Sequence, residues 1–135
     1  MAGYSGTPLW KKLGYKDGLV ACSEGAPKGY VVALALPSGV SVKWVQRAAA
    51  GTQFVHLFST SKSALASRLA VLRKTIEADG VIWVSWPKKS SGVQTDITEN
   101  EIREVALPIG LVDVKVCAVD ETWSGLKLVV RKKLR

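Results

Sequence analysis

The sequence lacks a long apolar run. Nowhere do about eighteen apolar residues follow one another, which is the length that a membrane-spanning helix needs. Residues 1–10 also lack the charged start and apolar middle of a secretory signal. We therefore expect a cytoplasmic protein without membrane contact.

Histidine and cysteine are scarce as well. His56 is the only histidine, which excludes a histidine-rich metal site, and Cys22 and Cys117 lack the spacing of a metal or redox motif. Both cysteines fall in apolar runs, which favours buried thiols over a disulfide or a nucleophile. His56 lies mid-strand, which favours a hydrogen-bonded core histidine over a catalytic one. We assign no metal, no cofactor and no catalytic residue.

Two further enzyme signatures are missing. No Walker-type Gly-Lys-Ser/Thr occurs, so nucleotide hydrolysis has little support. Ser85 lacks a surrounding Gly-x-Ser-x-Gly, so a hydrolase elbow is unsupported.

Apolar and basic residues are plentiful. In 135 residues, 47% are hydrophobic and 22% charged, which indicates a single folded domain over residues 1–135. Nineteen Lys and Arg against eleven Asp and Glu give a net charge of +8, which favours an anionic partner. The basic tail is either a solvated terminus or a nucleic-acid contact, and it contains Arg131, Lys132, Lys133 and Arg135.

Strand-like and helix-like patterns alternate along the chain. Apolar or alternating runs predict strands over 19–23, 40–45, 54–58, 81–86, 112–119 and 126–130. Four start signals predict helices: Thr7-Pro8, Pro27, Ser61 or Ser63, and a Thr98–Glu101 capping box. The first two helices are predicted over 8–13 and 27–35. Residues 120–125 suit a hairpin loop. This order predicts a three-layer α/β fold: a mainly parallel sheet, helices on both faces and a C-terminal antiparallel hairpin.

Four segments carry a resemblance to a bacterial domain-of-unknown-function family. They are Tyr4-Ser-Gly-Thr-Pro-Leu, Trp83-Val-Ser-Trp-Pro-Lys-Lys, Ile102-Arg-Glu-Val-Ala-Leu-Pro and Asp113-Val-Lys-Val-Cys-Ala-Val-Asp-Glu-Thr-Trp-Ser-Gly-Leu-Lys-Leu. From Phe54 onward the order of elements also resembles the second half of a class I methyltransferase-type Rossmann fold. The resemblance implies a fold and no activity.

The cofactor motifs of such methyltransferases are not matched. Binding of S-adenosylmethionine usually needs a glycine-rich turn after the first strand and an acid after the second. Residues 23–27 contain one glycine, and the second predicted strand is followed by Gln46 and Arg47. An active methyltransferase is disfavoured on this ground.

The carboxyl ends of the parallel strands predict where a ligand would bind. The candidate residues there are Trp86, Lys88, Lys89, Ser90, Asp120 and Trp123. The lysines and the Ser/Gly loop could hold a phosphate or carboxylate, or the loop is simply solvated. Asp120 and Glu121 could be paired carboxylates, although the favoured role of Asp120 is shaping the turn or pairing with a nearby lysine. The tryptophans could stack on a ligand or pack in the core.

Three functions follow from these patterns. The first is a binding module for a small anionic ligand, rather than an enzyme, at this rim. The second is an enzyme with an atypical S-adenosylmethionine pocket at residues 23–27. The third is nucleic-acid association through the tail. The chain is expected to be a monomer or a homodimer, and its hairpin edge strand could support the dimer.

Overall fold

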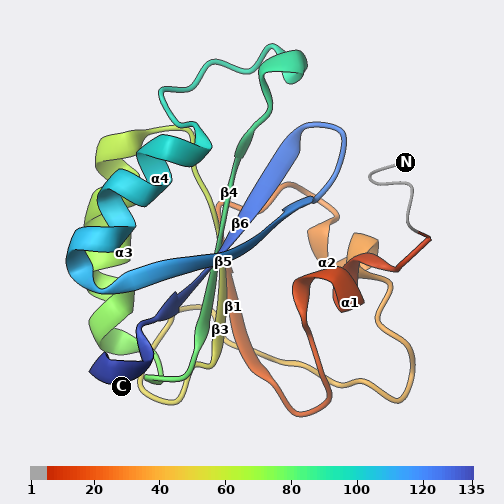
Figure 1. Ribbon diagram of the computed structural model, residues 1–135. Coiled ribbons are helices and arrows are strands. Elements are labelled where there is room, and N and C mark those ends of the chain that lie inside the picture. Colours follow the sequence, from red (N-terminus) through yellow and green to blue (C-terminus); the bar gives the residue numbers. More distant parts are fainter. Residues whose placement is uncertain (1–5) are drawn as a thin grey trace.

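The computed structural model describes residues 6–135, so Tyr4 and Ser5 of the first family segment lie outside the described residues. A six-stranded sheet forms the middle layer, in the spatial order β2-β1-β3-β4-β6-β5. Helices α3 and α4 cover one face and α1 and α2 cover the other, as Figure 1 shows. The strands are β1 Val20–Glu24, β2 Lys43–Trp44, β3 Phe54–Phe58, β4 Val81–Pro87, β5 Leu111–Ala118 and β6 Trp123–Val130. The helices are α1 Leu9–Leu13, α2 Tyr30–Leu34, α3 Lys62–Thr75 and α4 Glu99–Ala106.

Strand directions confirm the predicted fold class. Strands β2, β1, β3 and β4 are parallel, whereas β6 is antiparallel to both β4 and β5. Strand β5 therefore runs in the same direction as β4. Its carboxyl end, which leads into Asp120, lies at the same edge of the sheet as the ends of β1, β3 and β4. We call this edge the rim.

The largest departures from the predicted bounds are in β2, α2 and β6. The strand predicted over 40–45 is paired only at Lys43–Trp44. Helix α2 is shorter than 27–35 because Gly29 (φ 84°) and Ala35 (φ 56°) adopt left-handed backbone conformations at its two ends. Strand β6 begins at Trp123, inside the predicted loop. Helix α1 has Pro8 rather than Thr7 at its N-cap position.

Each face of the sheet buries its own apolar cluster. In β3, Val55 and Leu57 belong to the cluster under α3 and α4. Phe54 and Phe58 belong to the cluster under α1 and α2. Side chains alternate between the two faces of a strand, so a central strand covered on both sides has an apolar residue at nearly every position. All five residues of β3 are buried.

Helices α3 and α4 start at the signals that the sequence provides. The Ser61 side chain accepts a hydrogen bond from the backbone N–H of Ala64, 3.3 Å away. Thr98 and Glu101 form the predicted capping box. Since 14 residues form the longest helix, no helix within residues 6–135 is long and apolar enough to cross a membrane.

The two outer strands are irregular. Strand β2 has two residues, and β5 has a register shift between Asp113 and Lys115. Val114 and Val116, at and beside that shift, are about half exposed, at 53% and 49%. The regular part of the sheet is therefore confined to its centre.

The inner face of α3 should dominate the stability of the domain. Leu69 is fully buried, whereas Val71 on the same helix is 50% exposed. We expect Leu69→Ala to lower the free energy of unfolding by about 2–5 kcal/mol, because it removes apolar contacts and leaves a cavity. Val71→Ala should change it by less than about 0.5 kcal/mol. Urea denaturation measures both, and equal effects would show that α3 does not pack as described.

Candidate functional site

The sheet reverses its order between β1 and β3. From β1 the chain proceeds outward to β2, and from β3 it proceeds in the other direction to β4. The connection after β1 leads to α2 and that after β3 leads to α3, on opposite faces (Figure 1). The two loops separate at this switch point, which is where open α/β sheets bind ligands.

The loop after β1 approaches β3 closely. Gly25 has a φ of 69°, and a Cβ atom added there would lie 2.7 Å from the carbonyl oxygen of Phe58. Gly29, with a φ of 84°, ends the same loop. Residues 23–27 do contain one glycine, as the sequence shows, but the loop runs two residues further and has glycine at both ends. In the sequence, Gly29 stands directly before a helical run, and this position was the signal that a glycine ends the loop.

Three glycine substitutions separate the causes of strain in this loop. Gly51 has a φ of 93° with open space around it, and Gly39 has open space and no positive φ. Gly51→Ala should cost about 1–2 kcal/mol from the left-handed backbone alone. Gly39→Ala should be close to neutral. Gly25→Ala should cost more than Gly51→Ala because it adds the clash with Phe58. Thermal denaturation tests the order, and a Gly25→Ala variant no worse than Gly51→Ala contradicts the close approach.

A small pocket lies at the rim between segments that are distant in the sequence. Its volume is about 90 Å³, and its lining comes from α1, the loop before α2, α2 itself and the β5–β6 turn: Leu9, Pro27, Lys28, Gly29, Tyr30, Ala33, Val119 and Asp120. Pockets that enclose whole drug-sized ligands span about 300–1,000 Å³. This one, which we call the rim pocket, has room for one small group of a ligand.

Asp120 shapes the β5–β6 turn. Its Oδ1 accepts hydrogen bonds from the backbone N–H groups of Thr122 (2.8 Å) and Trp123 (2.7 Å). The Lys88 ammonium donates to the backbone carbonyl of Asp120 at 2.7 Å, and the Lys12 ammonium donates to that of Ala118 at 3.0 Å. Of the two roles favoured for Asp120, turn shaping is confirmed, and two lysines bind backbone carbonyls at the turn.

The six sequence-predicted site residues do not all meet. Lys88, Asp120 and Trp123 come together at the β5–β6 turn, where Trp123 is half-buried with its ring 5.1 Å from that of Phe58. Lys89 and Ser90 lie beyond them in an exposed single turn of 3₁₀ helix. Trp86 is 9% exposed and packs in the cluster under α3 and α4, on the opposite face from Trp123. The two tryptophans therefore face different layers and do not line one site.

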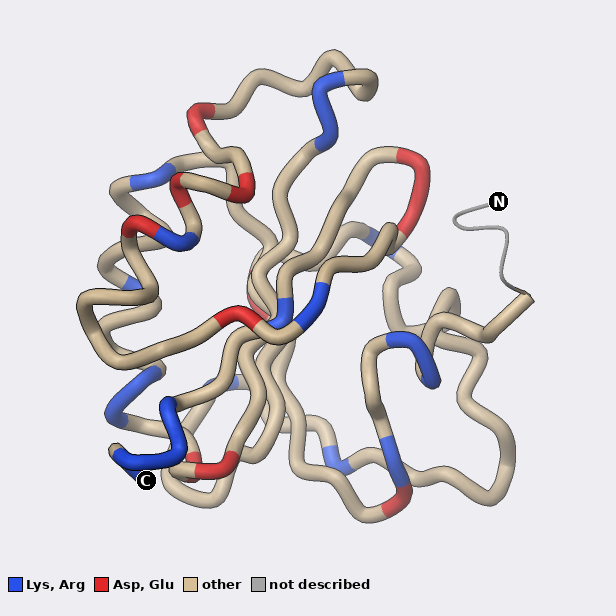
Figure 2. Tube along the Cα trace, viewed as in Figure 1, with Lys and Arg blue, Asp and Glu red and all other residues tan. Residues whose placement is uncertain are grey.

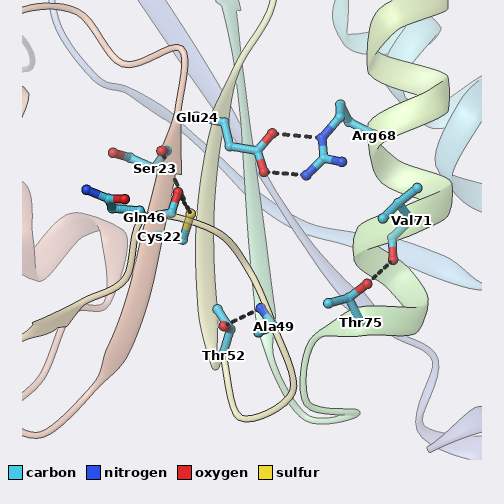
Figure 3. A network of polar contacts seen from close by, with 9 residues as sticks. All are labelled: Cys22, Ser23, Glu24, Gln46, Ala49, Thr52, Arg68, Val71 and Thr75. Atoms are coloured by element: carbon cyan, nitrogen blue, oxygen red, sulfur yellow. Dashed lines mark hydrogen bonds and ion pairs between the residues drawn. The ribbon is translucent and has the colours of Figure 1, made fainter.

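A second pocket runs beside α3, around the ion pair drawn in Figure 3. The Arg68 guanidinium donates two hydrogen bonds to the Glu24 carboxylate, at 2.8 and 2.6 Å. The pocket has a volume of about 370 Å³ and is lined by Glu24, Gln46, Arg47, Ala48, Arg68, Val71, Leu72 and Thr75. We call it the α3 groove. Sequence reasoning missed the ion pair because its partners are 44 residues apart and no local motif connects them.

The groove contains no free carboxylate at the end of β2. Gln46 and Arg47 follow that strand, and the nearby Glu24 already binds Arg68. Cys22 lies next to Gln46. Burial raises the pKa of its thiol, so the thiol stays protonated at neutral pH. Among residues 6–135 no group of three or more His, Cys, Asp or Glu side chains could hold a metal ion.

His56 is part of a buried hydrogen-bond chain. Its Nδ1 lies 2.6 Å from the Tyr30 hydroxyl, its Nε2 lies 2.6 Å from the Ser85 hydroxyl, and Tyr30 is 2.8 Å from the Tyr15 hydroxyl. His56 and Ser85 are fully buried, and burial lowers the pKa of His56 to about 3. The expectation of a hydrogen-bonded core histidine is confirmed.

The buried imidazole predicts a specific loss of stability in mild acid. The unfolded chain binds a proton at His56 near pH 6.5, whereas the native state does so only near pH 3. Stability is therefore complete above pH 6.5 and falls as the pH is lowered. Between pH 7 and pH 5 the loss should be about 2 kcal/mol. His56→Asn, which cannot titrate, should lose much less, and urea denaturation at both pH values measures the difference. A histidine NMR signal that titrates near pH 6 in the folded protein contradicts the prediction.

The strand order, the reversed hairpin and the rim together define a Rossmann-like α/β fold of the methyltransferase class. The chain belongs to a family described as "Protein of unknown function (DUF3052)", whose model matches residues 53–132. The predicted membership of a family of unknown function is thus confirmed. No curated protein sequence matches the chain.

Solved structures agree on the fold. An O-methyltransferase from neocarzinostatin biosynthesis, in complex with S-adenosylmethionine and a naphthoic acid, has a TM-score of 0.63 at 14% identity, over 90% of this chain and 50% of that one. A precorrin-6y C5,15-methyltransferase from Geobacter metallireducens has a TM-score of 0.59 at 13% identity, over 89% and 84%. LepI in complex with S-adenosylmethionine has a TM-score of 0.55 at 14% identity, over 93% and 47%. The chain thus spans half or less of the LepI and O-methyltransferase chains.

Proposed function

We propose that the protein is a binding module for a small anionic ligand, which it holds at the rim. The observation that carries this proposal is the rim pocket, formed by three separate segments at the edge where open α/β sheets bind ligands. The pocket is too small for a whole metabolite. It takes an anionic group of the ligand, and the remainder lies over the switch point between β1 and β3.

The charges around the pocket favour an anion. Lys28 lines it and is exposed, and the ammonium groups of Lys12 and Lys88 lie at the adjoining turn. Asp120 is the carboxylate in the lining, and two backbone N–H groups already bind it. A carboxylate or phosphate placed beside Lys28 therefore gains a cation and displaces no existing ion pair.

A second candidate function is binding of S-adenosylmethionine by an atypical pocket. The methyltransferase-like fold and the two left-handed glycines of the β1–α2 loop support it, since glycine lets a backbone approach a ligand closely. The α3 groove argues against it. An acid after β2, which usually binds the ribose hydroxyls, is replaced by Gln46, and Glu24 is occupied by Arg68.

The first test is a thermal-shift screen of the whole chain against sugar phosphates, nucleotides, small carboxylates, S-adenosylmethionine and S-adenosylhomocysteine. A ligand that binds only the native state adds about 2.7 kcal/mol of stability at a concentration of 100 times its Kd. We expect a shift with an anionic compound. Calorimetry should then show a loss of affinity of about tenfold or more in Lys28→Ala, as for a lost charged hydrogen bond. Lys16→Ala, which removes an exposed lysine away from the rim, is the matched control.

The outcomes separate the two candidates. A shift with a phosphate or carboxylate that Lys28→Ala abolishes and Lys16→Ala retains supports the rim pocket. Saturable binding of S-adenosylmethionine that is unaffected by Lys28→Ala favours the second candidate. If no compound produces a shift, or if Lys28→Ala leaves every affinity unchanged, the proposed site is wrong. Lys88→Ala serves as a second variant, because Lys88 follows β4 and its ammonium donates to the Asp120 carbonyl in the same turn.

A further inference from the structure

Six basic residues gather at the end of the molecule opposite the rim. Arg73 and Lys74 lie in the last turn of α3, and Arg131, Lys132, Lys133 and Arg135 follow β6. Figure 2 shows both segments coloured as Lys and Arg at the lower end of the molecule, close to the C-terminus. We call these six residues the base cluster.

The backbone around Gly110 joins the two halves of the cluster. Arg73 donates a hydrogen bond from Nε to the carbonyl of Ile109 at 3.1 Å. The backbone N–H of Arg131 donates to the carbonyl of Gly110 at 2.9 Å. Both segments are thus anchored to neighbouring peptide groups, although 58 positions separate the two arginines in the sequence. The sequence shows only the tail; the fold adds Arg73 and Lys74 to it.

The base cluster has no acidic partners. Within residues 6–135 none of its six side chains forms an ion pair, whereas Lys62, Arg68 and Arg103 all do. Glu77 and Asp79 lie in the turn after α3 and form no ion pair with the cluster either. Like charges held close together repel one another. An anion that binds among them lowers this repulsion.

The base cluster also contains a pocket and a buried hydrogen-bond donor without an acceptor. The pocket has a volume of about 340 Å³ and is lined by Leu107, Pro108, Ile109, Gly110, Arg131, Lys133 and Leu134. The Nε atom of Arg131 is buried and has no hydrogen-bond partner among the described residues. A buried donor without an acceptor destabilises the state that contains it. Binding an anion in the pocket allows the guanidinium to reorient toward an acceptor.

We infer that the base cluster binds the phosphate backbone of double-stranded nucleic acid, independently of sequence. Six cations on two segments suit a row of phosphates better than one isolated phosphate. Among residues 6–135, no tryptophan lies there as a platform for base stacking. Four of the five tryptophans pack on the α1 and α2 face, and Trp86 lies at the rim end of β4. Contacts to the backbone of a duplex need no such platform.

The test is fluorescence anisotropy of a labelled DNA duplex of arbitrary sequence, titrated with the whole chain between 50 and 200 mM KCl. If four to six cations contact phosphates, log K should fall against log[salt] with a slope between about −3.5 and −5.5. The double variant Lys132→Ala/Lys133→Ala should weaken binding and reduce that slope by about 2. Neither side chain makes a hydrogen bond or ion pair within the described residues, so the fold should be retained.

The matched control is Lys11→Ala/Lys115→Ala. It removes the same net charge from α1 and from the middle of β5, at residues outside the base cluster, and it should keep nearly the full slope. A decrease equal to that of the tail variant would show that only the overall charge matters and would overturn the site. Absence of binding at 50 mM KCl would overturn it as well.

Two further measurements test whether the site needs a row of phosphates and whether it is separate from the rim pocket. Polyphosphate should compete with the duplex, because it presents the same row of phosphates, whereas pyrophosphate at equal phosphate concentration should compete far less. If pyrophosphate competes equally, the site binds a single small anion and the inference is wrong. Lys28→Ala should leave duplex binding unchanged, which distinguishes failure of the base cluster from failure of the rim pocket.

Discussion

The burial of both faces of β3 is the constraint on which the rest of the structure depends. A central strand covered on both sides needs a layer of helices on each side, and this chain supplies the second layer with two helices of only five residues. The polar exception in the strand is His56, whose two ring nitrogens both need partners once water is excluded. Tyr30 from α2 and Ser85 from β4 provide them. The hydrogen-bond chain thus fixes the short helix to the sheet where apolar area alone is limited.

Four acidic residues pair with cations along the α3 and α4 layer. Glu24, Glu99, Glu104 and Asp113 are all used in ion pairs with Arg68, Arg103 and Lys62 along the α3 and α4 layer. Within the described part of the chain, no ion pair involves Lys12, Lys28 or Lys88 at the rim or a residue of the base cluster. Exposed ion pairs of this kind contribute little to stability. Their larger effect is to neutralise part of the charge along the α3 and α4 layer.

The sequence predicts the fold better than the site. The run of Phe54–Phe58 matches a strand to the residue, and the Thr98–Glu101 capping box starts a helix, because both signals are local. The α3 groove and the Glu24–Arg68 pair depend on contacts between distant segments, for which the sequence holds no signal. Trp86 was expected near a ligand because it ends a strand. Side chains alternate along β4, and Trp86 falls in phase with Ile82 and Val84, which places it under α3 and α4.

The irregular outer strands have a consequence for the behaviour of the chain at high concentration. Open sheet edges present unpaired N–H and C=O groups, and they are templates on which other chains can add strands and aggregate. Here one edge offers only two residues, one of them Lys43, and the other is interrupted beside Lys115. Short length, a bulge and a lysine each discourage such pairing. The exposed Val114 and Val116 therefore lie on an edge whose geometry hinders the growth of an intermolecular sheet.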